Sequence, residues 1–288
     1  MPMNENANAN STQQPRTTAA ARTVLVTGGT GKTGRRVAER LTALGHTARI
    51  GSRTAPVPFD WNDDTTWDAA LDGVTAAYLA YSPDLAFPGA VESVGAFARH
   101  AAKAGVERLV LLSGRGEEAA QAAEAAVAEA GTGWTVVRCS WFSQNFSESF
   151  FLDAVLAGEL AVPTGTAVEP FVDADDIADV AVAALTEDGH DGEVYELTGP
   201  RLLSFADAAA ELSAATGRDI RFTPITVEEC REMLAAIGLP ADFADLFTLI
   251  LDGRNACLAD GVRRVLGREP RDFADFARDT AASGVWNV

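Results

Sequence analysis

The sequence is poor in basic residues, and lysine is almost missing from it. Its 288 residues include only two lysines, Lys32 and Lys103, and its 23 Lys and Arg are outnumbered by 41 Asp and Glu, which gives a formal net charge of −18. A surface of this charge repels nucleic-acid phosphates and anionic lipid at long range. We therefore expect no nucleic-acid partner and no membrane partner, and any site for an anionic small molecule must be built locally.

Cysteine and histidine are also scarce. The three cysteines form no CxxC pair, so neither a disulfide framework nor a Cys-rich zinc site is indicated. The three histidines share no spacing, and a Ser-His-Asp triad has no support. The acidic run at 173–179 is typical of a helix start, so we expect no metal site.

Long apolar runs are absent as well. No stretch approaches the roughly 20 consecutive apolar residues that span a bilayer. Residues 1–22 are polar and repetitive and lack the apolar segment of a secretory signal. We expect a disordered tail over 1–22 and a cytoplasmic protein.

What the sequence does have is a regular alternation of short apolar runs and helical patterns up to about residue 140. Strands that are apolar almost throughout, separated by helices, are typical of a parallel sheet covered on both faces. The pattern predicts an α/β fold with a doubly wound parallel Rossmann sheet over 23–145 and a smaller, mostly helical substrate-binding lobe over 146–288. The expected strands are 23–26, 47–52, 74–81, 107–113, 134–139 and 192–199, and the expected helices are 35–45, 63–71, 89–105, 117–131 and 173–186.

The strongest motif is a GxxGxxG run, Gly28, Gly31 and Gly34, between the first strand and the first helix. Glycine there lets a pyrophosphate approach the free amides and the positive dipole end of the helix. The same residues could instead form a purely structural turn. A P-loop is the minor alternative, because Gly31-Lys32-Thr33 supplies its ending, but Val26 stands where that motif requires glycine.

The second strand ends without a carboxylate. A carboxylate at this position indicates NAD, whereas a cation suits the 2′-phosphate of NADP. Here the strand ends Gly51-Ser52-Arg53, so Arg53 with Ser52 favours NADP(H) over NAD(H), although a solvated surface arginine would give the same sequence.

These residues resemble a known family. The segments TGGTGKTG (27–34), GSR (51–53), FDW (59–61), LLSG (111–114) and VVRCSWFSQNF (136–146) are similar to the NmrA-like branch of atypical short-chain dehydrogenases/reductases. The resemblance runs from about residue 23 to 225, and it implies an NAD(P)H-dependent oxidoreductase, of the kind that includes quinone reductases, redox-sensing regulators and natural-product tailoring enzymes.

The resemblance also implies roles for individual residues. Gly28, Thr30, Gly31, Lys32, Thr33 and Gly34 would line the pyrophosphate, Ser52 and Arg53 the 2′-phosphate, Asp60 and Trp61 the adenine, and Ala80, Tyr81, Ser82 and Ser113 the ribose and nicotinamide. Ser113 and Asn145 would be the catalytic candidates. Tyr81, Trp141, Phe142, Asn145 and Phe146 would contact the substrate.

One departure from the wider superfamily matters. The YxxxK pair that protonates a carbonyl is impossible here, because Gly28 and Arg99 stand four residues before the two lysines. A quinone needs little acid help, so we expect hydride transfer to a quinone-like aromatic substrate. Trp141 and Phe142 would form its apolar wall, and Phe150 and Phe151 would lie in the core.

Several functions remain open on these residues. The first is a reductase acting on a polyketide in antibiotic biosynthesis, with a part in a cofactor-free hydroxylation. The alternative is a non-catalytic redox sensor that binds NADP(H) and has no enclosed second pocket. An isomerase or dehydratase with a relic nucleotide is a third hypothesis.

Overall fold

The structure is a computed structural model that describes residues 21–236, 238, 244, 247 and 251–288. The predicted tail over 1–22 therefore lies almost wholly outside the described residues. Among the described residues, none of the helices has the length and apolar character needed to cross a bilayer.

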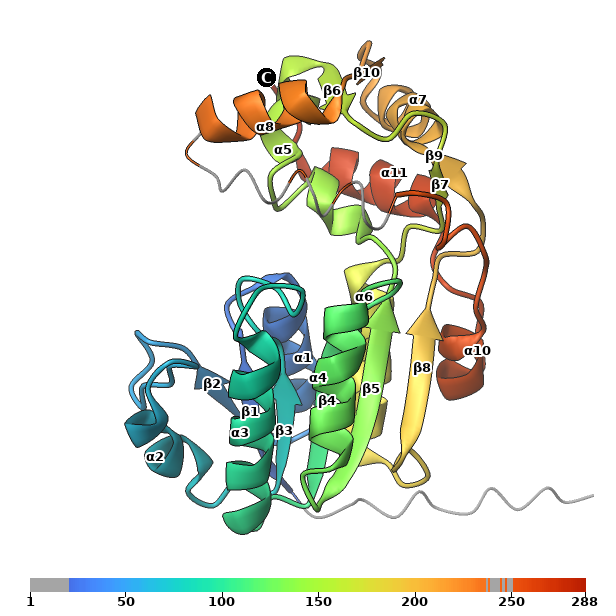
Figure 1. The fold of residues 1–288 in the computed structure, drawn as a ribbon. Helices are drawn as coiled ribbons and strands as arrows, with labels where there is room; N and C mark the ends of the chain where they lie inside the picture. The colour runs from blue at the N-terminus through green and yellow to red at the C-terminus, as the bar shows by residue number, and fades with distance from the viewer. Residues whose placement is uncertain (1–20, 237, 239–243, 245–246, 248–250) are drawn as a thin grey trace, which may run out of the picture.

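A six-stranded parallel sheet forms the centre of the larger lobe (Figure 1). Its strands lie in the order β2-β1-β3-β4-β5-β8, so the chain moves outward from β1 to β2 and then crosses back to β3. Such a reversal leaves a crevice at the carboxyl edge, where α/β proteins bind ligands. The predicted fold class is confirmed. The strands are β1 (Thr23–Thr27), β2 (Thr47–Gly51), β3 (Ala76–Leu79), β4 (Arg108–Gly114), β5 (Gly133–Cys139) and β8 (Glu193–Leu197).

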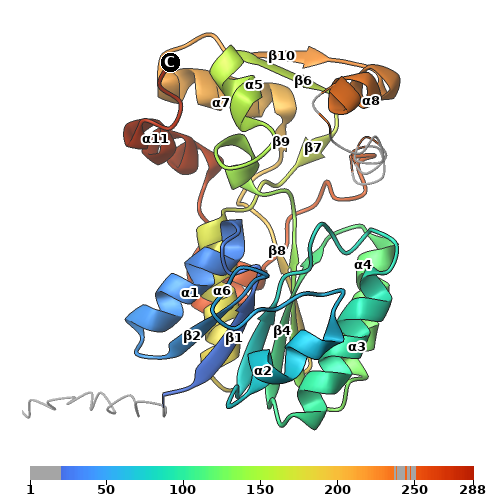
Figure 2. The ribbon, with the colours of Figure 1, turned by 90° about the vertical axis from the view of Figure 1, so that its left-hand side faces the viewer.

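Helices cover both faces of the sheet (Figure 2). Successive residues of β1 serve opposite faces, because Leu25 packs in one apolar cluster while Val24 and Val26 pack in the other. This is why the three central residues of the strand are all apolar. On the Val26 side lie α1 (Lys32–Ala43), α6 (Ala174–Thr186) and α10 (Gly261–Leu266); on the Leu25 side lie α2 (Trp67–Leu71), preceded by η1 (Asp64–Thr66), and α3 (Ala90–Lys103) and α4 (Glu118–Ala128).

A second lobe sits above the carboxyl edge of the sheet (Figure 1). Its core is aromatic and includes Phe146, Phe171, Phe205, Phe273 and Trp286, all almost fully buried. Two small pairings, β10 with β6 and β7 with β9, frame it. Its elements are η2 (Ser143–Phe146), α5 (Leu152–Ala157), β6 (Glu159–Val162), β7 (Val168–Glu169), β9 (Leu203–Ser204), α7 (Phe205–Thr216), β10 (Arg221–Pro224), α8 (Val227–Ala236) and α11 (Phe273–Ser283).

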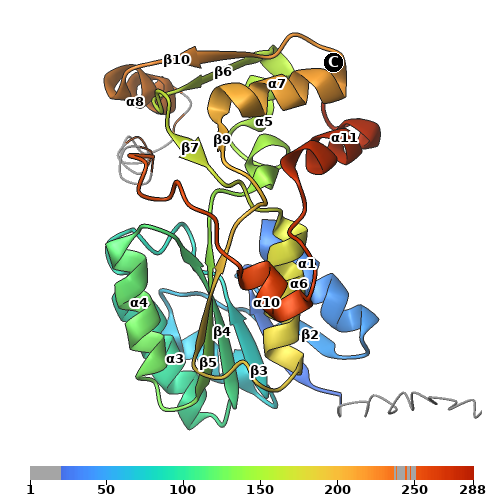
Figure 3. The ribbon, with the colours of Figure 1, turned by 90° about the vertical axis from the view of Figure 1, so that its right-hand side faces the viewer.

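The division expected at residue 145 is wrong, because the chain passes between the lobes several times. After β7 it returns to the sheet as α6 and β8, which pairs with β5, and after α8 it returns again as α10 (Figure 3). Strand β8 extends the sheet beyond β5, so residues beyond 145 contribute to both lobes.

The acidic run at the start of α6 is structural. Asp173 caps the helix by accepting a hydrogen bond of 2.8 Å from the amide of Asp175, and it pairs with Arg271 at 2.9 Å. Asp175 and Asp179 pair with Arg40 of α1. Among the described residues, no group of His, Cys, Asp or Glu is arranged to hold a metal ion.

Candidate functional site

The glycine-rich loop joins β1 to α1 at the carboxyl edge of the sheet. Gly28 has a positive φ of 61°, and α1 begins at Lys32 without a side-chain cap or an acidic residue in its first turn. A Cβ at Gly34 would overlap the backbone of Gly28 and lie 2.9 Å from the Cα of Gly29. The loop therefore packs closely under an open helix N-terminus, which is the arrangement that fits a dinucleotide pyrophosphate.

The end of β2 leaves one cation available beside this loop. Arg53 is exposed, and within the described part of the chain its guanidinium makes no hydrogen bond or ion pair. Ser52 lies next to it, with its hydroxyl 3.5 Å from that of Thr54. The 2′-phosphate role of this pair stays a prediction.

The residues expected at the adenine lie on the α2 and α3 side of the sheet. Trp61 is 9% exposed and packs edge-on against Phe59 and Phe97, with ring centroids 5.0 and 5.3 Å away. The carbonyl of Asp60 accepts a hydrogen bond of 2.9 Å from the indole of Trp67. Trp61 is thus a core residue, and its contact with adenine stays a prediction.

The end of β3 is fixed to β1 at the crossover. The amide of Ala80 donates a 2.8 Å hydrogen bond to the hydroxyl of Thr27, and the Cβ of Ala80 lies directly against Gly28. Tyr81 follows and lines a cavity beside the glycine loop, whereas Ser82 is exposed. Ala80 and Tyr81 are thereby placed between the glycine loop and the cavity.

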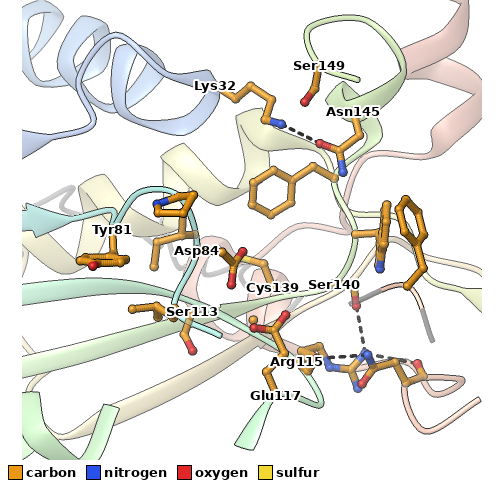
Figure 4. A pocket seen from close by; sticks show the side chains of 18 of the residues that line it. Lys32, Tyr81, Asp84, Ser113, Arg115, Glu117, Cys139, Ser140, Asn145 and Ser149 are labelled. Carbon is orange, nitrogen blue, oxygen red and sulfur yellow. Dashed lines mark hydrogen bonds between the residues drawn. The ribbon is translucent and has the colours of Figure 1, made fainter. Parts of the chain in front are cut away.

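A cavity of about 420 Å³ opens between the two lobes, beside the glycine loop (Figure 4). Four of the five residues predicted to contact substrate lie on its wall, together with Ser113 and with Lys32 of the predicted pyrophosphate loop. The predicted residues that line it are Lys32, Tyr81, Ser113, Trp141, Phe142 and Asn145. This volume lies in the range of small-molecule pockets.

Lys32 and Asn145 meet at the edge of this cavity. The Lys32 Nζ donates a 2.7 Å hydrogen bond to Asn145 Oδ1 and lies 5.9 Å from the centre of the Phe142 ring. Burial lowers the pKa of Lys32 to about 8, and the carboxylate of Glu148 partly opposes that shift. The predicted phosphate loop and the predicted nicotinamide contact are therefore in direct contact.

The aromatic segment after β5 divides between wall and core, and it does so differently from the prediction. Trp141 and Phe142 line the cavity as expected, and so does Phe150, which is 41% exposed and was expected in the core. Phe146 was expected to contact substrate, but it is fully buried and packs in the second lobe. Phe151 is a core residue, as predicted. The 3₁₀ turn η2 causes the difference because it turns Phe146 inward.

Ser113 stands on the cavity wall, but its hydroxyl is already occupied. It donates a 2.5 Å hydrogen bond to Glu124, whose carboxylate also binds Arg138. Arg138 in turn pairs with Glu196 of β8 at 2.9 Å. The catalytic role predicted for Ser113 stays a prediction, and in this structure the residue anchors α4 to the sheet.

Two carboxyl groups in the cavity were missed by the sequence reasoning. Asp84, in the loop after β3, and Glu117, between β4 and α4, both line the cavity, and Figure 4 shows their carboxyl groups near its centre. Burial, reinforced by Asp84 and Glu124, raises the pKa of Glu117 to about 8. Their positions at the carboxyl ends of β3 and β4 were the signal that could have found them.

The comparisons with known proteins agree with this geometry. The chain is 35% identical over 275 residues to an oxidoreductase of Bacillus subtilis described as uncharacterized, covering 90% of this chain and 95% of that one. It is also 35% identical over 238 residues to the NAD(P)H azoreductase of Xenophilus azovorans, covering 78% and 82%. A search against protein-family models gave no match.

A solved structure shares the fold. The NADPH-dependent quinone oxidoreductase of Escherichia coli, solved with NADPH, superposes with a TM-score of 0.71 at 21% identity, covering 89% of this chain and 99% of that one. At this identity the likeness concerns the fold.

Proposed function

The chain belongs to the NmrA-like branch of the atypical short-chain dehydrogenases/reductases, a family of NAD(P)H-dependent oxidoreductases, and we propose from this premise that it is an NADPH-dependent reductase of flat aromatic, quinone-like substrates. The observation that carries the proposal is the cavity that opens between the glycine loop and the aromatic wall of the second lobe.

The residues along the carboxyl edge of the sheet support the assignment of NADPH as the cofactor. The open first turn of α1 suits the pyrophosphate, and Arg53 offers a free guanidinium to the 2′-phosphate. When bound, the reduced nicotinamide supplies a hydride. Lys32 and Asn145, joined at the mouth of the cavity, would orient that end of the cofactor.

The residues of the cavity wall support the assignment of a flat aromatic substrate. Trp141, Phe142, Phe150 and Phe247 present aromatic surfaces to the cavity, and the rings of Trp141 and Phe247 pack with centroids 5.0 Å apart. Aromatic side chains bury a planar ring system at low conformational cost and hold it against a second ring. A fused-ring quinone fits this chemistry, as an azo compound does. A place in polyketide or antibiotic biosynthesis stays a prediction from the resemblance.

The same cavity argues against the redox sensor. A sensor needs a dinucleotide site and no second pocket beside the nicotinamide, whereas here a lined cavity adjoins Lys32 and Asn145. We therefore place the reductase first.

The direct test is NADPH oxidation measured with a panel of benzoquinones, naphthoquinones, anthraquinones and azo dyes. We expect quinone-dependent turnover with NADPH as the better donor. Phe150→Ala should raise KM for the quinones several-fold, while the control Met233→Ala, an exposed apolar residue on α8, should not. Tight NADPH binding with no turnover of any acceptor would favour the sensor instead.

A further inference from the structure

The carboxyl group of Glu117 lies in the cavity at the end of β4. Glu117 is 7% exposed and stands immediately before α4, yet its side chain does not cap that helix. Instead the carboxyl folds over Gly114 at the end of β4. A Cβ on Gly114 would meet it, with Oε2 only 2.8 Å away, so glycine at 114 leaves the room that this carboxyl occupies.

A second carboxyl group faces Glu117 from a different part of the chain. Asp84 lies in the loop after β3 and accepts a 2.8 Å hydrogen bond from the amide of Ala86. Figure 4 shows the Asp84 and Glu117 carboxyl groups close together inside the cavity. Burial raises the pKa of both groups, and the charge of each opposes ionisation of the other, as for paired carboxyls in general.

The cations around this pair are committed to other partners. Arg138 of β5 binds Glu124 and Glu196. Arg115 reaches Glu196 at 3.2 Å and the hydroxyl of Ser140 at 3.0 Å. Arg254, which also approaches this region, binds Asp252 and the carbonyl of Gly116.

Lys32, the other cation on the cavity wall, hydrogen-bonds Asn145 instead, so within the described part of the chain the pair has no ion-pair partner. Among the described residues, no side chain or amide donates a hydrogen bond to the Glu117 carboxyl, and Glu124, the other nearby acid, adds negative charge. Two carboxyl groups in such a place keep a proton between them at neutral pH.

We propose that Asp84 and Glu117 share one proton in the cavity and that Glu117 delivers it to a heteroatom of the reduced substrate. The proposal rests on the proposed function and adds the proton donor that the absent YxxxK pair leaves unassigned. It also narrows the substrate to neutral acceptors whose heteroatom needs a proton after reduction, such as quinones or azo compounds.

With the reduced dinucleotide bound, a C–H bond of its nicotinamide would break, and the hydride with its two electrons would form an O–H bond at one quinone oxygen, leaving an oxidised nicotinamide and a hydroquinone monoanion. The Glu117 O–H bond breaks, its proton forms the O–H bond at the second oxygen, and a carboxylate remains. Asp84, which is half-buried, returns a proton from solvent to Glu117.

The kinetic test compares Glu117→Gln with Glu118→Gln, the exposed neighbour on α4. In the native enzyme kcat for quinone reduction should fall above about pH 8, as Glu117 ionises. Glu117→Gln should lose about ten-fold or more in kcat at pH 7, together with that pH dependence and the solvent deuterium isotope effect. Glu118→Gln should behave like the native enzyme. Unchanged kcat and isotope effect in Glu117→Gln would overturn the proposal.

A second measurement does not depend on turnover. In protein labelled with ¹³C at the glutamate carboxyl, two NMR resonances, those of Glu117 and Glu169, should titrate near pH 8, and the one that belongs to Glu117 should disappear in Glu117→Gln. Asp84→Asn should move that titration to lower pH, because it removes a like charge. A Glu117 resonance that titrates near 4 to 5, as an ordinary glutamate does, would refute the shared proton. A Glu117 resonance near pH 8 without turnover of any acceptor would refute the proposed function and the delivery step, leaving the shared proton in place.

Discussion

The Nζ of Lys32 donates a hydrogen bond of 2.7 Å to the Oδ1 of Asn145, 113 residues further along the chain. Lys32 belongs to the first turn of α1, and Asn145 to η2 at the start of the second lobe. This contact joins the predicted phosphate site to the predicted nicotinamide site, and it makes the charge of Lys32 relevant to both.

We expect NADPH affinity to depend on pH through Lys32. Burial lowers its pKa to about 8, so its ammonium carries a charge below that pH and loses it above. The NADPH dissociation constant should therefore rise as pH increases from about 7 to 9.5, by about ten-fold or more if one charged hydrogen bond is lost. Lys32→Met should weaken binding at pH 7.

The control for this prediction is Lys103→Met, which changes the exposed lysine at the end of α3. Because Glu117 titrates in the same range, the pH series should be repeated in Glu117→Gln. Fluorescence titration with NADPH gives the constants. An affinity that stays flat in that variant across the range would contradict the role of Lys32.

Arg53→Ala should change the affinity for NADPH but not the affinity for NADH. If the guanidinium holds the 2′-phosphate, its loss weakens NADPH by about 1.5–3 kcal/mol, or roughly 10- to 150-fold in Kd, and leaves NADH almost unchanged. Calorimetry with both cofactors measures this difference, with Arg221→Ala, an exposed arginine of β10, as the control. Equal losses for NADPH and NADH would show that Arg53 does not read the 2′-phosphate.

Gly34→Ala and Gly31→Ala form a matched pair within the glycine loop. A methyl group at 34 would collide with the backbone of Gly28, whereas one at 31 would lie 3.2 Å from the carbonyl oxygen of Gly28 alone. We expect Gly34→Ala to destabilise the fold by about 1–3 kcal/mol and to abolish NADPH binding. Gly31→Ala should cost less stability. Denaturation and NADPH titration of both variants check this order, and equal behaviour would contradict it.

Glu169 should make the protein less stable as pH rises. It is fully buried in β7, neither of its carboxyl oxygens has a hydrogen-bond partner among the described residues, and burial raises its pKa to about 8. The folded state thus keeps a proton that the unfolded chain releases near pH 4.5. Between these values the free energy of unfolding should fall by up to about 1.4 kcal/mol per pH unit for this group.

Glu169→Gln removes this contribution and should be more stable than the native protein at about pH 8. The buried Glu117 contributes with the same sign, so some slope should remain. Urea denaturation at about pH 6 and pH 8 measures the effect, with Glu159→Gln on the exposed side of β6 as the control. A variant with the native slope would exclude Glu169 as its source.

The sequence alone determined the order of strand, glycine loop and helix at 23–43, because local apolar runs and glycines are decisive there. It also determined the parallel sheet. The glycine loop depends on backbone preferences, and the sheet depends on burial of both its faces, which the three apolar residues at the centre of β1 reflect. Arg53 was singled out for the same reason, since it stands two residues after the end of β2, and its role stays a prediction.

Other features depended on contacts between distant segments. β8 returned to the sheet although it lies beyond residue 145. The phenylalanines after β5 cannot be told apart by residue type, yet the structure buries Phe146 in the core and leaves Phe150 on the cavity wall.

The carboxyl groups of Asp84 and Glu117 show most clearly what the sequence alone does not reveal. Their only mark in the sequence is a place in a loop between a strand and a helix, which many other residues share. Only the parallel pairing of β3 with β4 brings both loops to one edge of the sheet, where both side chains line the cavity between the lobes. Local sequence fixes a residue's conformation, but its charge and partners depend on what the folded chain places around it.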